Sequence, residues 1–399
     1  MIQNSRNSGR GRIETRLRID QGRDPGMARN KRQSVVFQLR SLTGGVGIVV
    51  ARLAKEFERL GVDVAVVCEK PLHRAVTSFP DTIDVESTGS IMKTSGFLRM
   101  LAFLARRRPD HVITNDRRSN VAAIRAKRVL RLRGAVSNIL HDTYSVALQF
   151  KSEEDQRAQI RHYREIYPRN HRIFAVSRGV ATAFAELSGL SPDRIDVTYN
   201  PMPVLAQLRA QSEASLHRWL EGPRRVPVIV SAGRLQHDQK NFAMLIRAFH
   251  RLRQQRAARL VIIGEGKDRA RLEQLVTELG IAGDVDLPGW QQNPYPFYRN
   301  CDVFAHCSIH EGFGLAIAEA LSLGARVVAM DCPHGPREIL RDGEFGLLVP
   351  YKDEVAMAAA LDRALQTPAP EAPSLAKHIA RFDAESVARR YLDLLGIKC

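Results

Sequence analysis

The feature that most constrains the fold of this chain is a pattern that runs along it twice, in which short β-branched segments alternate with segments of helical periodicity. The pattern begins with VVFQL at residues 35–39 and a helix over about 46–60. It restarts with VPVIVSAGR at 226–234 and continues to about residue 350. Such alternation is typical of parallel sheets with helices on both faces. The sequence therefore predicts an α/β fold of two open, Rossmann-like parallel-sheet domains with a cleft between them.

The two runs of this pattern divide the chain into segments. Residues 1–32 are rich in Arg, Ser, Gly and Asn without apolar periodicity, so we expect a basic disordered tail, which a true start at Met27 would shorten. The segment YNPMPV places two prolines after a short strand and interrupts the alternation. The expected boundaries are 33–199 for the first domain, 200–205 for the linker, 206–380 for the second domain and 381–399 for a closing helix that packs back on the first domain.

Individual elements follow from the same periodicity. In the first domain we expect further strands near residues 62–67, 111–114, 136–140 and 172–176, and helices near 95–107, 119–132 and 154–167. In the second domain we expect strands within LVIIGEG, VDLPGW, CDVFAHCS and ARVVAMD. Ligands of such sheets bind at the carboxyl ends of the strands, so the cleft between the domains is the expected site.

Charge and composition narrow the classes of partner. Lys and Arg (60) exceed Asp and Glu (43), which gives a formal charge of +17. Nucleic acid, an anionic membrane surface and phosphate-bearing small substrates all fit this charge. Ten cations within residues 106–133 predict a membrane contact in the first domain, with a solvated basic face as the alternative. No apolar run approaches about 18 to 20 residues, and the leading segment lacks the apolar core of a secretory signal, so we expect a cytoplasmic protein. The five scattered cysteines indicate neither a disulfide framework nor a zinc site.

The most informative motif is HEGFGLAIAEAL at residues 310–321. Gly312 and Gly314 stand where a helix is expected to begin, so backbone N–H groups there can hold a phosphate. Glu311 and Glu319 are eight residues apart, slightly more than two helical turns, which would place both carboxylates along one side of the cleft. Either glutamate alone is explained as a solvated or helix-capping residue, but their combination with the glycine turn favours a ligand site.

A second motif, SAGRLQHDQKNF at residues 231–242, ends a strand in a turn of small residues and presents Arg234 and Lys240. Two cations beside a diphosphate stabilise the negative charge that grows on a departing phosphate, without a metal ion. Taken alone, the pair is better explained as two surface cations in a basic chain.

A third motif, SLTGGVG at residues 41–47, leaves two alternatives open. Gly45 and Gly47, with Glu69 near the end of the second strand, match part of a dinucleotide-binding fingerprint. The third glycine of the fingerprint is missing, and Ser41 to Thr43 lengthen the turn. The other interpretation is a glycine loop that faces a phosphate or an acceptor in the cleft.

Two further signals are weak by themselves. His141 ends a strand, where side chains project into the cleft, although a lone histidine is more often structural. Asp284 and Asp286 spell a DxD, which is typical of a metal site that holds a nucleoside diphosphate. In a short strand, however, alternation sends both aspartates to one face, so we favour a structural role for them.

The second half of the chain resembles the family 4 retaining glycosyltransferases of the two-domain GT-B fold. The matching segments cover nearly all of residues 226–350 and are GRLQHDQKNF, VIIGEGKDRARLEQLVTELG, VDLPGW, CDVFAHCSIHEGFGLAIAEAL, VVAMDCPHGPREIL and GEFGLLVP. The first domain is similar to the family through SLTGGVG, NILHD and IFAVSRGV. The YNP of the linker and the late CPxGPREIL are similar to bacterial enzymes that build cell-surface polysaccharides.

This resemblance implies an acceptor-binding first domain, a second domain that binds a nucleotide sugar, and a catalytic set of His141, Arg234, Lys240 and Glu311. In that set Glu311 contacts the donor sugar and the two cations hold the diphosphate, while Glu319 holds the donor ribose. No metal or other cofactor is expected. The implied donor-binding residues are Gly44, Gly45, Arg234, Lys240, Gly264, Glu265, Gly266, Glu311, Gly312, Phe313, Gly314, Leu315 and Glu319.

The chain departs from the family pattern at Gly47, where an acidic residue is frequent, and in an Arg-to-Lys spacing one residue longer than the commonest form. We expect retaining transfer of a sugar from a nucleoside-diphosphate sugar to a hydroxyl of a surface glycan or lipid-linked acceptor, as in lipopolysaccharide, capsule or exopolysaccharide synthesis. The expected location is the cytoplasm or the inner face of the cell membrane. The alternatives are a dinucleotide-dependent oxidoreductase that uses Gly45 and Gly47, and a nucleic-acid-binding protein, for which no recognisable motif is present.

Overall fold

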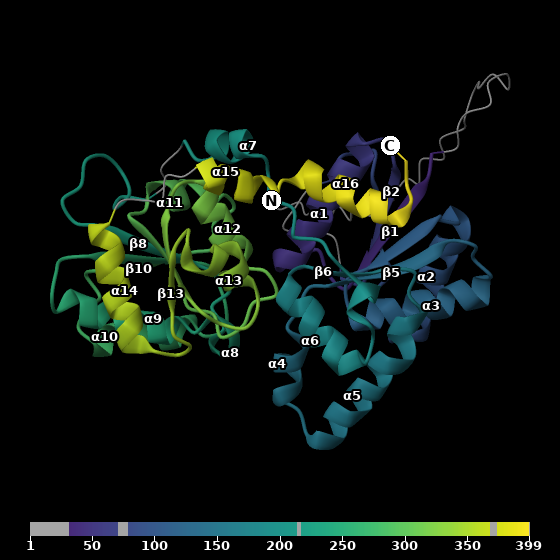
Figure 1. The fold of residues 1–399 in the computed structure, drawn as a ribbon, viewed down its shortest axis with the longest axis horizontal. Coiled ribbons are helices and arrows are strands. Elements are labelled where there is room, and N and C mark those ends of the chain that lie inside the picture. The colour runs from purple at the N-terminus through teal and green to yellow at the C-terminus, as the bar shows by residue number, and fades with distance from the viewer. Residues whose placement is uncertain (1–31, 71–78, 214–216, 368–372, 399) are drawn as a thin grey trace, which may run out of the picture. The chain divides into compact units, whose positions relative to one another are not determined.

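The computed structural model describes residues 32–70, 79–213, 217–367 and 373–398. The described part of residues 33–399 forms one compact unit built on two parallel sheets (Figure 1). The predicted tail, apart from Arg32, and the alternative start at Met27 lie outside the described residues. Within the described ranges, every helix falls short of the length and hydropathy that crossing a bilayer requires.

The first sheet has seven parallel strands in the order β3-β2-β1-β4-β5-β6-β7. These strands are β1 (Ser34–Leu39), β2 (Asp63–Cys68), β3 (Asp84–Ser87), β4 (His111–Thr114), β5 (Ala135–Leu140), β6 (Ile173–Ala175) and β7 (Ile195–Val197). The helices among them are α1 (Gly44–Arg59), α2 (Thr94–Arg107), α3 (Arg117–Leu130), α4 (Tyr144–Gln149), α5 (Glu153–Ile166) and α6 (Arg178–Ser188), with short 3-10 turns η2 (Tyr167–Arg169) and η3 (Pro192–Arg194). The apolar runs of β1, β4 and β5 are almost wholly buried, as expected for strands covered on both faces.

The second sheet has six parallel strands in the order β10-β9-β8-β11-β12-β13. These strands are β8 (Val228–Ala232), β9 (Arg259–Ile263), β10 (Val285–Gly289), β11 (Val303–His306), β12 (Arg326–Met330) and β13 (Leu347–Val349). Its helices are α8 (His237–Lys240), α9 (Phe242–Arg253), α10 (Arg269–Glu278), α11 (Tyr295–Asn300), α12 (Leu315–Ser322), α13 (Gly335–Ile339), α14 (Glu354–Gln366) and α15 (Pro373–Ala380), with the 3-10 turn η4 (Arg341–Gly343). The two sheets confirm the predicted α/β class. Their strand orders reverse between β1 and β4 and between β8 and β11, where ligands bind in such sheets.

The chain passes between the two sheets twice, and the two crossing segments pair with each other. The backbone N–H of Met202 donates to the carbonyl of Phe382 at 2.7 Å, and the N–H of Ala384 donates to the carbonyl of Met202 at 2.9 Å. Helix α7 (Leu205–Gln211) follows the first crossing, and helix α16 (Ala384–Leu395) follows the second. These bonds tie the linker to the return segment.

Helix α16 packs against elements of the first sheet, beside α1 (Figure 1). The ring of Tyr391 lies with its centroid 4.6 Å from that of Phe174 on β6 and 6.4 Å from that of Phe57 on α1. All three rings are at most 1% exposed. The last helix is therefore part of the core beneath the first sheet.

The structure corrects the predicted start of the first helix, which concerns the candidate site. Helix α1 begins at Gly44 rather than near residue 46, so Gly44 to Gly47 form its first turn and not a loop. A Cβ on Gly47 would lie 2.3 Å from the carbonyl oxygen of Leu42, so the backbone of this turn leaves no space for a side chain. The acidic residue that is frequent at this position in the family would not fit here. A helix that starts this early also removes the tight glycine turn that a dinucleotide fingerprint needs.

Some elements were not predicted from the sequence. Strand β3 was missed because its four residues, DVES, contain no apolar run, and α4 was missed because it is a helix of only six residues. Helix α6 starts directly after β6, with Ser177 as its N-cap. The four described cysteines, Cys68, Cys301, Cys307 and Cys332, are buried free thiols.

Candidate functional site

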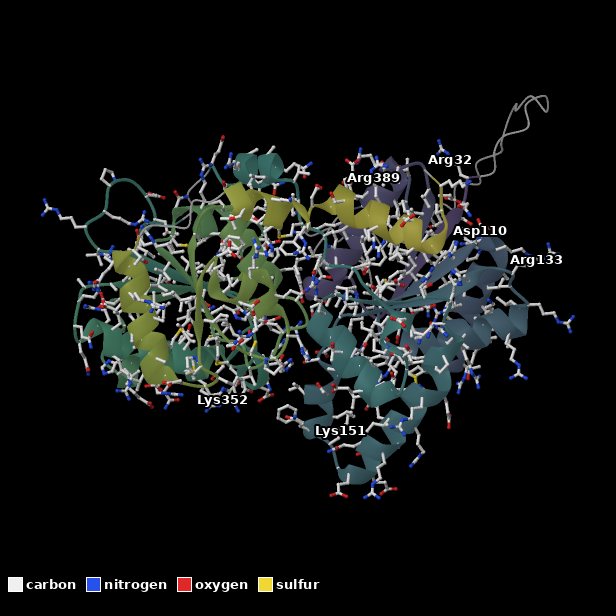
Figure 2. All side chains as sticks on the ribbon, viewed as in Figure 1. Arg32, Asp110, Arg133, Lys151, Lys352 and Arg389 are labelled. Carbon is white, nitrogen blue, oxygen red and sulfur yellow. The ribbon has the colours of Figure 1, made fainter. Side chains whose placement is uncertain are left out.

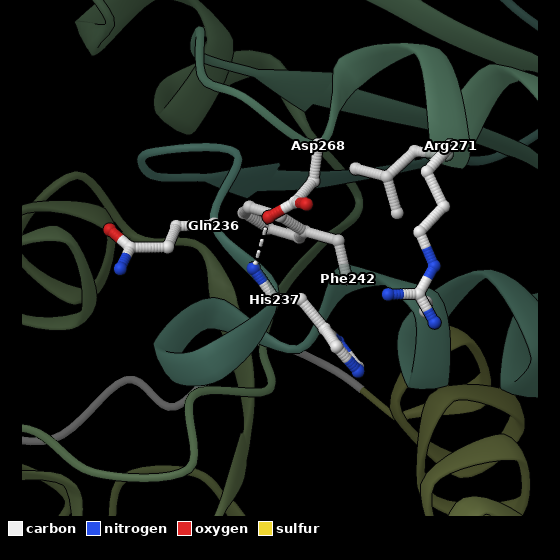
Figure 3. A pocket seen from close by; sticks show the side chains of 7 residues that line it. Gln236, His237, Phe242, Asp268 and Arg271 are labelled. Atoms are coloured by element: carbon white, nitrogen blue, oxygen red, sulfur yellow. Dashed lines mark hydrogen bonds between the residues drawn. The ribbon is translucent and has the colours of Figure 1, made fainter.

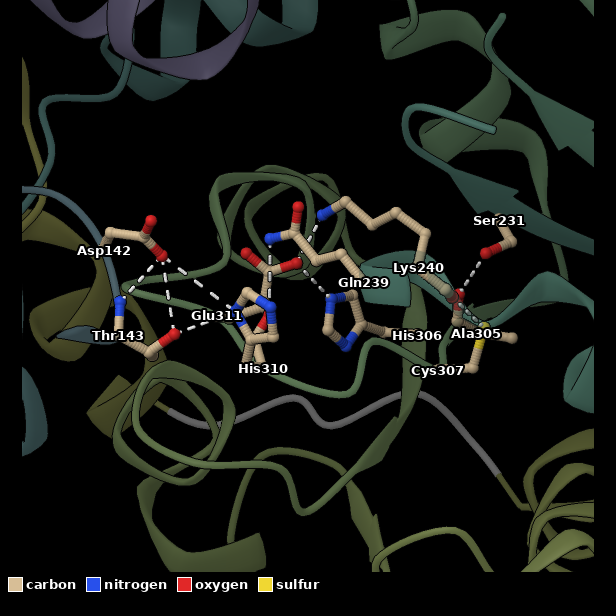
Figure 4. Close-up of polar contacts among 10 residues, drawn as sticks. All are labelled: Asp142, Thr143, Ser231, Gln239, Lys240, Ala305, His306, Cys307, His310 and Glu311. Atoms are coloured by element: carbon tan, nitrogen blue, oxygen red, sulfur yellow. Dashed lines mark hydrogen bonds and ion pairs between the residues drawn. The ribbon is translucent and has the colours of Figure 1, made fainter. Parts of the chain in front are cut away.

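A buried ionic cluster lies at the carboxyl edge of the second sheet (Figure 4). Lys240 ends α8, and its Nζ donates a hydrogen bond to Oε1 of Glu311. His306 is the last residue of β11, and its Nε2 lies 3.2 Å from the same oxygen. Burial opposes ionisation of Glu311, but the Lys240 ammonium and the His306 imidazole overcome it and hold the pKa of Glu311 below its ordinary range. Glu311 is therefore a carboxylate at neutral pH, and the structure brings together two of the four residues predicted to be catalytic.

The loop that carries Glu311 contacts the first half of the chain directly. Oγ1 of Thr143 lies 2.8 Å from Nδ1 of His310 (Figure 4), and the Ser177 hydroxyl donates to the carbonyl of Gly312 at 2.7 Å. A Cβ on Gly312 would lie only 2.0 Å from the carbonyl oxygen of His141. Only glycine permits so close an approach of these two backbones, which joins the carboxyl edges of both sheets.

His141 follows β5 and is held at the edge of the first sheet. Its Nε2 lies 2.8 Å from Oδ1 of Asn115, which follows β4. Burial lowers the pKa of His141 to about 3, so the ring is neutral at physiological pH. A neutral imidazole fixed in this way offers a hydrogen-bonding nitrogen rather than a positive charge.

Arg234 lies where two other predicted features meet. It follows β8 and is exposed, and no ion pair to it is found in the described part of the chain. A Cβ on Gly44 would lie 3.1 Å from Nη2 of Arg234, so the guanidinium lies against the first residue of α1. No side chain caps the N-terminus of α1. A guanidinium beside uncapped backbone N–H groups makes a positive region suited to an anion.

The Gly264 to Gly266 loop supports the Arg234 turn. A Cβ on Gly264 would lie 1.9 Å from the carbonyl oxygen of Gly233, and one on Gly266 would lie 2.2 Å from that of Leu235. The N–H of Leu235 donates to the carbonyl of Glu265 at 2.9 Å, while the Glu265 carboxylate accepts from Arg269 at 2.8 Å. The glycines thus set the backbone that presents Arg234, and the Glu265 side chain is engaged within its own segment.

The two glutamates of the 310–321 motif do not share one helical face. Gly314, with φ 105°, precedes the first residue of α12, Leu315, so Glu311 stands before the helix and Glu319 within it. The predicted helical spacing of the two carboxylates is therefore wrong, because the helix starts only after the glycines. The ring of Phe313 packs against those of Tyr199 and Phe382, with centroids 5.9 and 5.2 Å away, which leaves only its backbone for a ligand.

Glu319 is buried and has a partner that the sequence did not indicate. Nη2 of Arg52, on α1, donates to Oε1 of Glu319 at 2.8 Å and to the hydroxyl of Tyr295 at 2.9 Å. Arg52 and Glu319 are 267 residues apart, so no local pattern could reveal the pair. Their ion pair is separate from the Lys240–Glu311 pair.

The DxD aspartates are both paired within the second domain. Asp284 accepts from Nη2 and Nε of Arg253 at 2.7 and 2.9 Å, and Asp286 lies 2.9 Å from Nε2 of His217. In the described ranges no group of three or more His, Cys, Asp or Glu side chains is arranged to hold a metal ion.

A small pocket lies near α8 and α9 and is separate from these contacts (Figure 3). In it the backbone N–H of His237 donates to Asp268 at 2.7 Å. The residues that line it are Gln236, His237, Phe242, Ala243, Asp268, Arg271 and Leu272, which include none of the predicted site residues.

The histidines whose pKa is lowered in the folded chain predict how stability depends on pH. Burial lowers the pKa of seven histidines: His111, His141, His162, His171, His306, His334 and His378. Because the unfolded chain takes up protons first, near pH 6.5, their contribution is complete above that pH and is lost on acidification. For His141 the loss is about 2 kcal/mol at pH 5.

We therefore expect the free energy of unfolding to fall between pH 7.5 and pH 5, and to fall less steeply in His141→Gln. Denaturant unfolding at a series of pH values measures both slopes. A free energy that stays constant, or equal slopes in the two proteins, would contradict this expectation.

Comparisons with known proteins show which family the chain belongs to. Residues 43–204 match a family model described as Glycosyltransferase Family 4, and residues 226–367 match one described as Glycosyl transferases group 1. The chain is 33% identical over 203 residues to the N-acetylgalactosamine-N,N'-diacetylbacillosaminyl-diphospho-undecaprenol 4-alpha-N-acetylgalactosaminyltransferase of Campylobacter jejuni subsp. jejuni serotype O:2, which is 50% of this chain and 52% of that protein. It is 35% identical over 184 residues to the lipopolysaccharide core biosynthesis glycosyltransferase LpsE of Rhizobium meliloti, which is 45% of this chain and 52% of that protein. The matches thus span about half the length of these curated relatives.

Solved structures show the same fold at low identity. Anabaena Alr3699/HepE in complex with UDP and glucose superposes with a TM-score of 0.70 at 18% identity, covering 92% of this chain and all of that one. The lipopolysaccharide outer core galactosyltransferase WaaB superposes with a TM-score of 0.69 at 21% identity, covering 91% of this chain and 99% of that one. With a glycosyltransferase model matched on each of its two sheets, the chain belongs to the glycosyltransferases of the two-domain GT-B fold.

Proposed function

We propose that this protein transfers a sugar from a nucleoside-diphosphate sugar to a hydroxyl of a surface glycan or lipid-linked acceptor, with retention of the anomeric configuration. The observation that carries the proposal is the exposed guanidinium of Arg234 against the uncapped start of α1. A departing nucleoside diphosphate carries negative charge that such a preorganised region stabilises. Lys240, whose ammonium pairs with Glu311, adds a second cation beside the same turn, because a Cβ on Gly233 would lie 3.2 Å from its Cδ.

The other site residues take roles that agree with their surroundings. The Glu311 carboxylate, kept ionised by Lys240 and His306, accepts hydrogen bonds from hydroxyls of the donor sugar. Glu319 accepts hydrogen bonds from the ribose hydroxyls. His141, neutral and oriented by Asn115, contacts the donor at the reacting centre from the first domain. Bond cleavage in this scheme relies on electrostatic stabilisation of the leaving diphosphate.

The relatives support this choice of donor and acceptor class. One curated relative is named for transfer to a diphospho-undecaprenol-linked sugar and another for lipopolysaccharide core biosynthesis. One solved neighbour holds UDP and glucose. We therefore propose a nucleotide sugar as donor and a lipid-linked or lipopolysaccharide acceptor, reached from the cytoplasmic side of the membrane.

A screen of nucleotide sugars tests the proposal. The purified chain is incubated with each donor and with lipid-linked or lipopolysaccharide acceptors, and release of nucleoside diphosphate is measured. Acceptor-dependent release from at least one donor is expected. Absence of release from every donor, together with quenching of nicotinamide fluorescence on binding of NADH or NADPH, would favour the oxidoreductase alternative instead.

We also propose that the first domain binds an anionic membrane surface. Eight of the ten cations between residues 106 and 133 have no ion pair in the described ranges; only Arg106 and Arg107 do. Leu98 on α2 and Val129 on α3 are exposed, at 57% and 63%, which adds apolar contacts to a basic surface. Arg133 extends outward from the turn after α3 (Figure 2). Basic residues near a bilayer attract anionic lipid at about 1 kcal/mol each.

Co-sedimentation of the full chain with vesicles measures this contact. We expect binding that rises with anionic lipid content, falls with salt and weakens at least about 10-fold in Arg125→Gln/Arg128→Gln. The matched control is Arg389→Gln/Arg390→Gln on α16, which removes two arginines that already have acidic partners. Binding that ignores lipid charge, or equal losses in the two double variants, would count against the proposal.

A further inference from the structure

Arg52 is a buried cation that bonds to three different parts of the chain. Besides the bonds of Nη2 to Glu319 and to the Tyr295 hydroxyl, Nη1 donates to the carbonyl of Pro201 at 3.0 Å. The Arg52 and Glu319 side chains are 16% and 9% exposed. Burial opposes the charge of Arg52, but the Glu319 carboxylate overcomes this and raises the pKa of Arg52. The guanidinium is therefore a permanent, fixed charge.

These bonds orient one carboxylate oxygen and leave the other available. Oε1 of Glu319 accepts from Arg52, whereas no hydrogen bond to Oε2 is found among the described residues. A carboxylate held at one oxygen by a planar guanidinium loses much of its rotational freedom. Its second oxygen then points in a fixed direction, as a ligand hydroxyl requires.

We infer that Arg52 is a positioning residue for recognition of the donor ribose: by holding Oε1 of Glu319, it presents Oε2 to the ribose hydroxyls. This inference rests on the proposed function. Arg52 belongs to α1 of the first sheet, Glu319 to α12 of the second, and Pro201 to the crossing segment. Ribose recognition therefore depends on contact between the two halves, and Glu319 is fully oriented only while α1 lies against α12.

The inference predicts that a protein without Arg52 discriminates less between a ribose ligand and its dideoxy form. The probes are UDP, GDP and ADP, each paired with its 2′,3′-dideoxy counterpart, and binding is measured calorimetrically on the full chain. We expect wild type to bind its preferred diphosphate at least about 10-fold more tightly than the dideoxy counterpart, the scale of a hydrogen bond to a charged group. Arg52→Met should reduce this ratio to about 2 or less, as Glu319→Gln should, while affinity for the dideoxy probe changes little.

Three further variants make the result specific. Arg52→Lys keeps a point charge but cannot span three acceptors, so its ratio should be intermediate. Arg52→Met/Glu319→Gln removes both buried charges and should match Glu319→Gln alone. If Arg52→Met leaves Glu319 unpaired and fails to fold, Arg52→Lys carries the test, because it keeps both charges. Arg59→Met is the matched control, because Arg59 lies on the same helix and pairs with Glu56 and Glu385 instead. Its ratio should equal that of wild type.

The outcomes distinguish failure of the proposed role of Glu319 from failure of the inferred role of Arg52. A wild-type protein that binds none of the diphosphates, or does not distinguish them from the dideoxy probes, would overturn the proposed role of Glu319 and the inference with it. A wild-type ratio that persists in Arg52→Lys and in Arg52→Met would overturn the role of Arg52 alone. Equal weakening of both probes by Arg52→Met would show a purely structural residue and would also overturn it.

Discussion

Replacement of Arg234 by alanine is expected to lower sugar-transfer turnover by about 100-fold or more, the scale seen when one preorganised charge-stabilising donor is lost. Arg234 is exposed and has no ion pair in the described ranges. Its removal therefore leaves no buried charge without a partner, and the variant should fold normally. Lys240→Ala should lower turnover to a similar extent. There, however, Glu311 stays buried without its ammonium partner, which costs about 3 to 5 kcal/mol of stability.

We expect this catalysis to need no divalent metal, because the two cations and the N–H groups at Gly312 to Gly314 can supply the positive field. Turnover of metal-free enzyme in excess chelator measures this directly. Asp284→Asn is the control, since its carboxylate pairs with Arg253 and we give it no part in the reaction. Activity abolished by chelator and restored by magnesium or manganese, with Asp284→Asn inactive and Arg234→Ala near normal, would replace this mechanism with a metal-dependent one.

Gly312→Ala is expected to lower turnover by about 10- to 100-fold, because displacements near 1 Å at a reacting centre have effects of that size. The added Cβ would lie 2.0 Å from the carbonyl oxygen of His141, so one of the two backbones must move. The clash lies between the halves of the chain and not within either core. Stability should therefore fall by no more than about 1 to 3 kcal/mol, the usual cost of overpacking.

The matched control is Gly283→Ala. Gly283 has no neighbouring atom within 4 Å of an added Cβ, so the same chemical change should leave both turnover and unfolding unaltered. Steady-state kinetics and denaturant unfolding of the two variants make the comparison. A Gly312→Ala enzyme with wild-type turnover would show that the close approach of Gly312 to His141 plays no part in the reaction.

The strands that carry the site could be predicted because parallel strands are buried on both faces and read as apolar runs. The expected strand at 111–114 coincides with β4, and the closing helix expected within 381–399 is α16, which spans Ala384–Leu395. The residues at which helices begin were harder to predict. The three glycines in the first turn of α1 show no apolar periodicity, so the start of this helix was placed too late. Helix α12 begins only at Leu315, after the glycines, so Glu311 lies outside the helix that contains Glu319.

Long-range contacts could not be predicted from the sequence, for a different reason. The motifs indicated Lys240 and Glu311 separately, but their hydrogen bond depends on how β8 and β11 pair in the sheet. Arg52 gave no signal at all, because it stands in an ordinary amphipathic helix and its partners are distant in the chain. Likewise, the place of Arg234 against Gly44 depends on contact between the two sheets, which no local pattern encodes.

The anomeric configuration of the transferred sugar tests the central claim most directly. The chain is incubated with an α-configured nucleotide sugar identified in the donor screen and with its acceptor, and the product is examined by NMR. Our account predicts a new α-glycosidic linkage to an acceptor hydroxyl, formed with stoichiometric release of nucleoside diphosphate and greatly reduced in Arg234→Ala. A β-linked product, or release of diphosphate without any sugar joined to the acceptor, would contradict it.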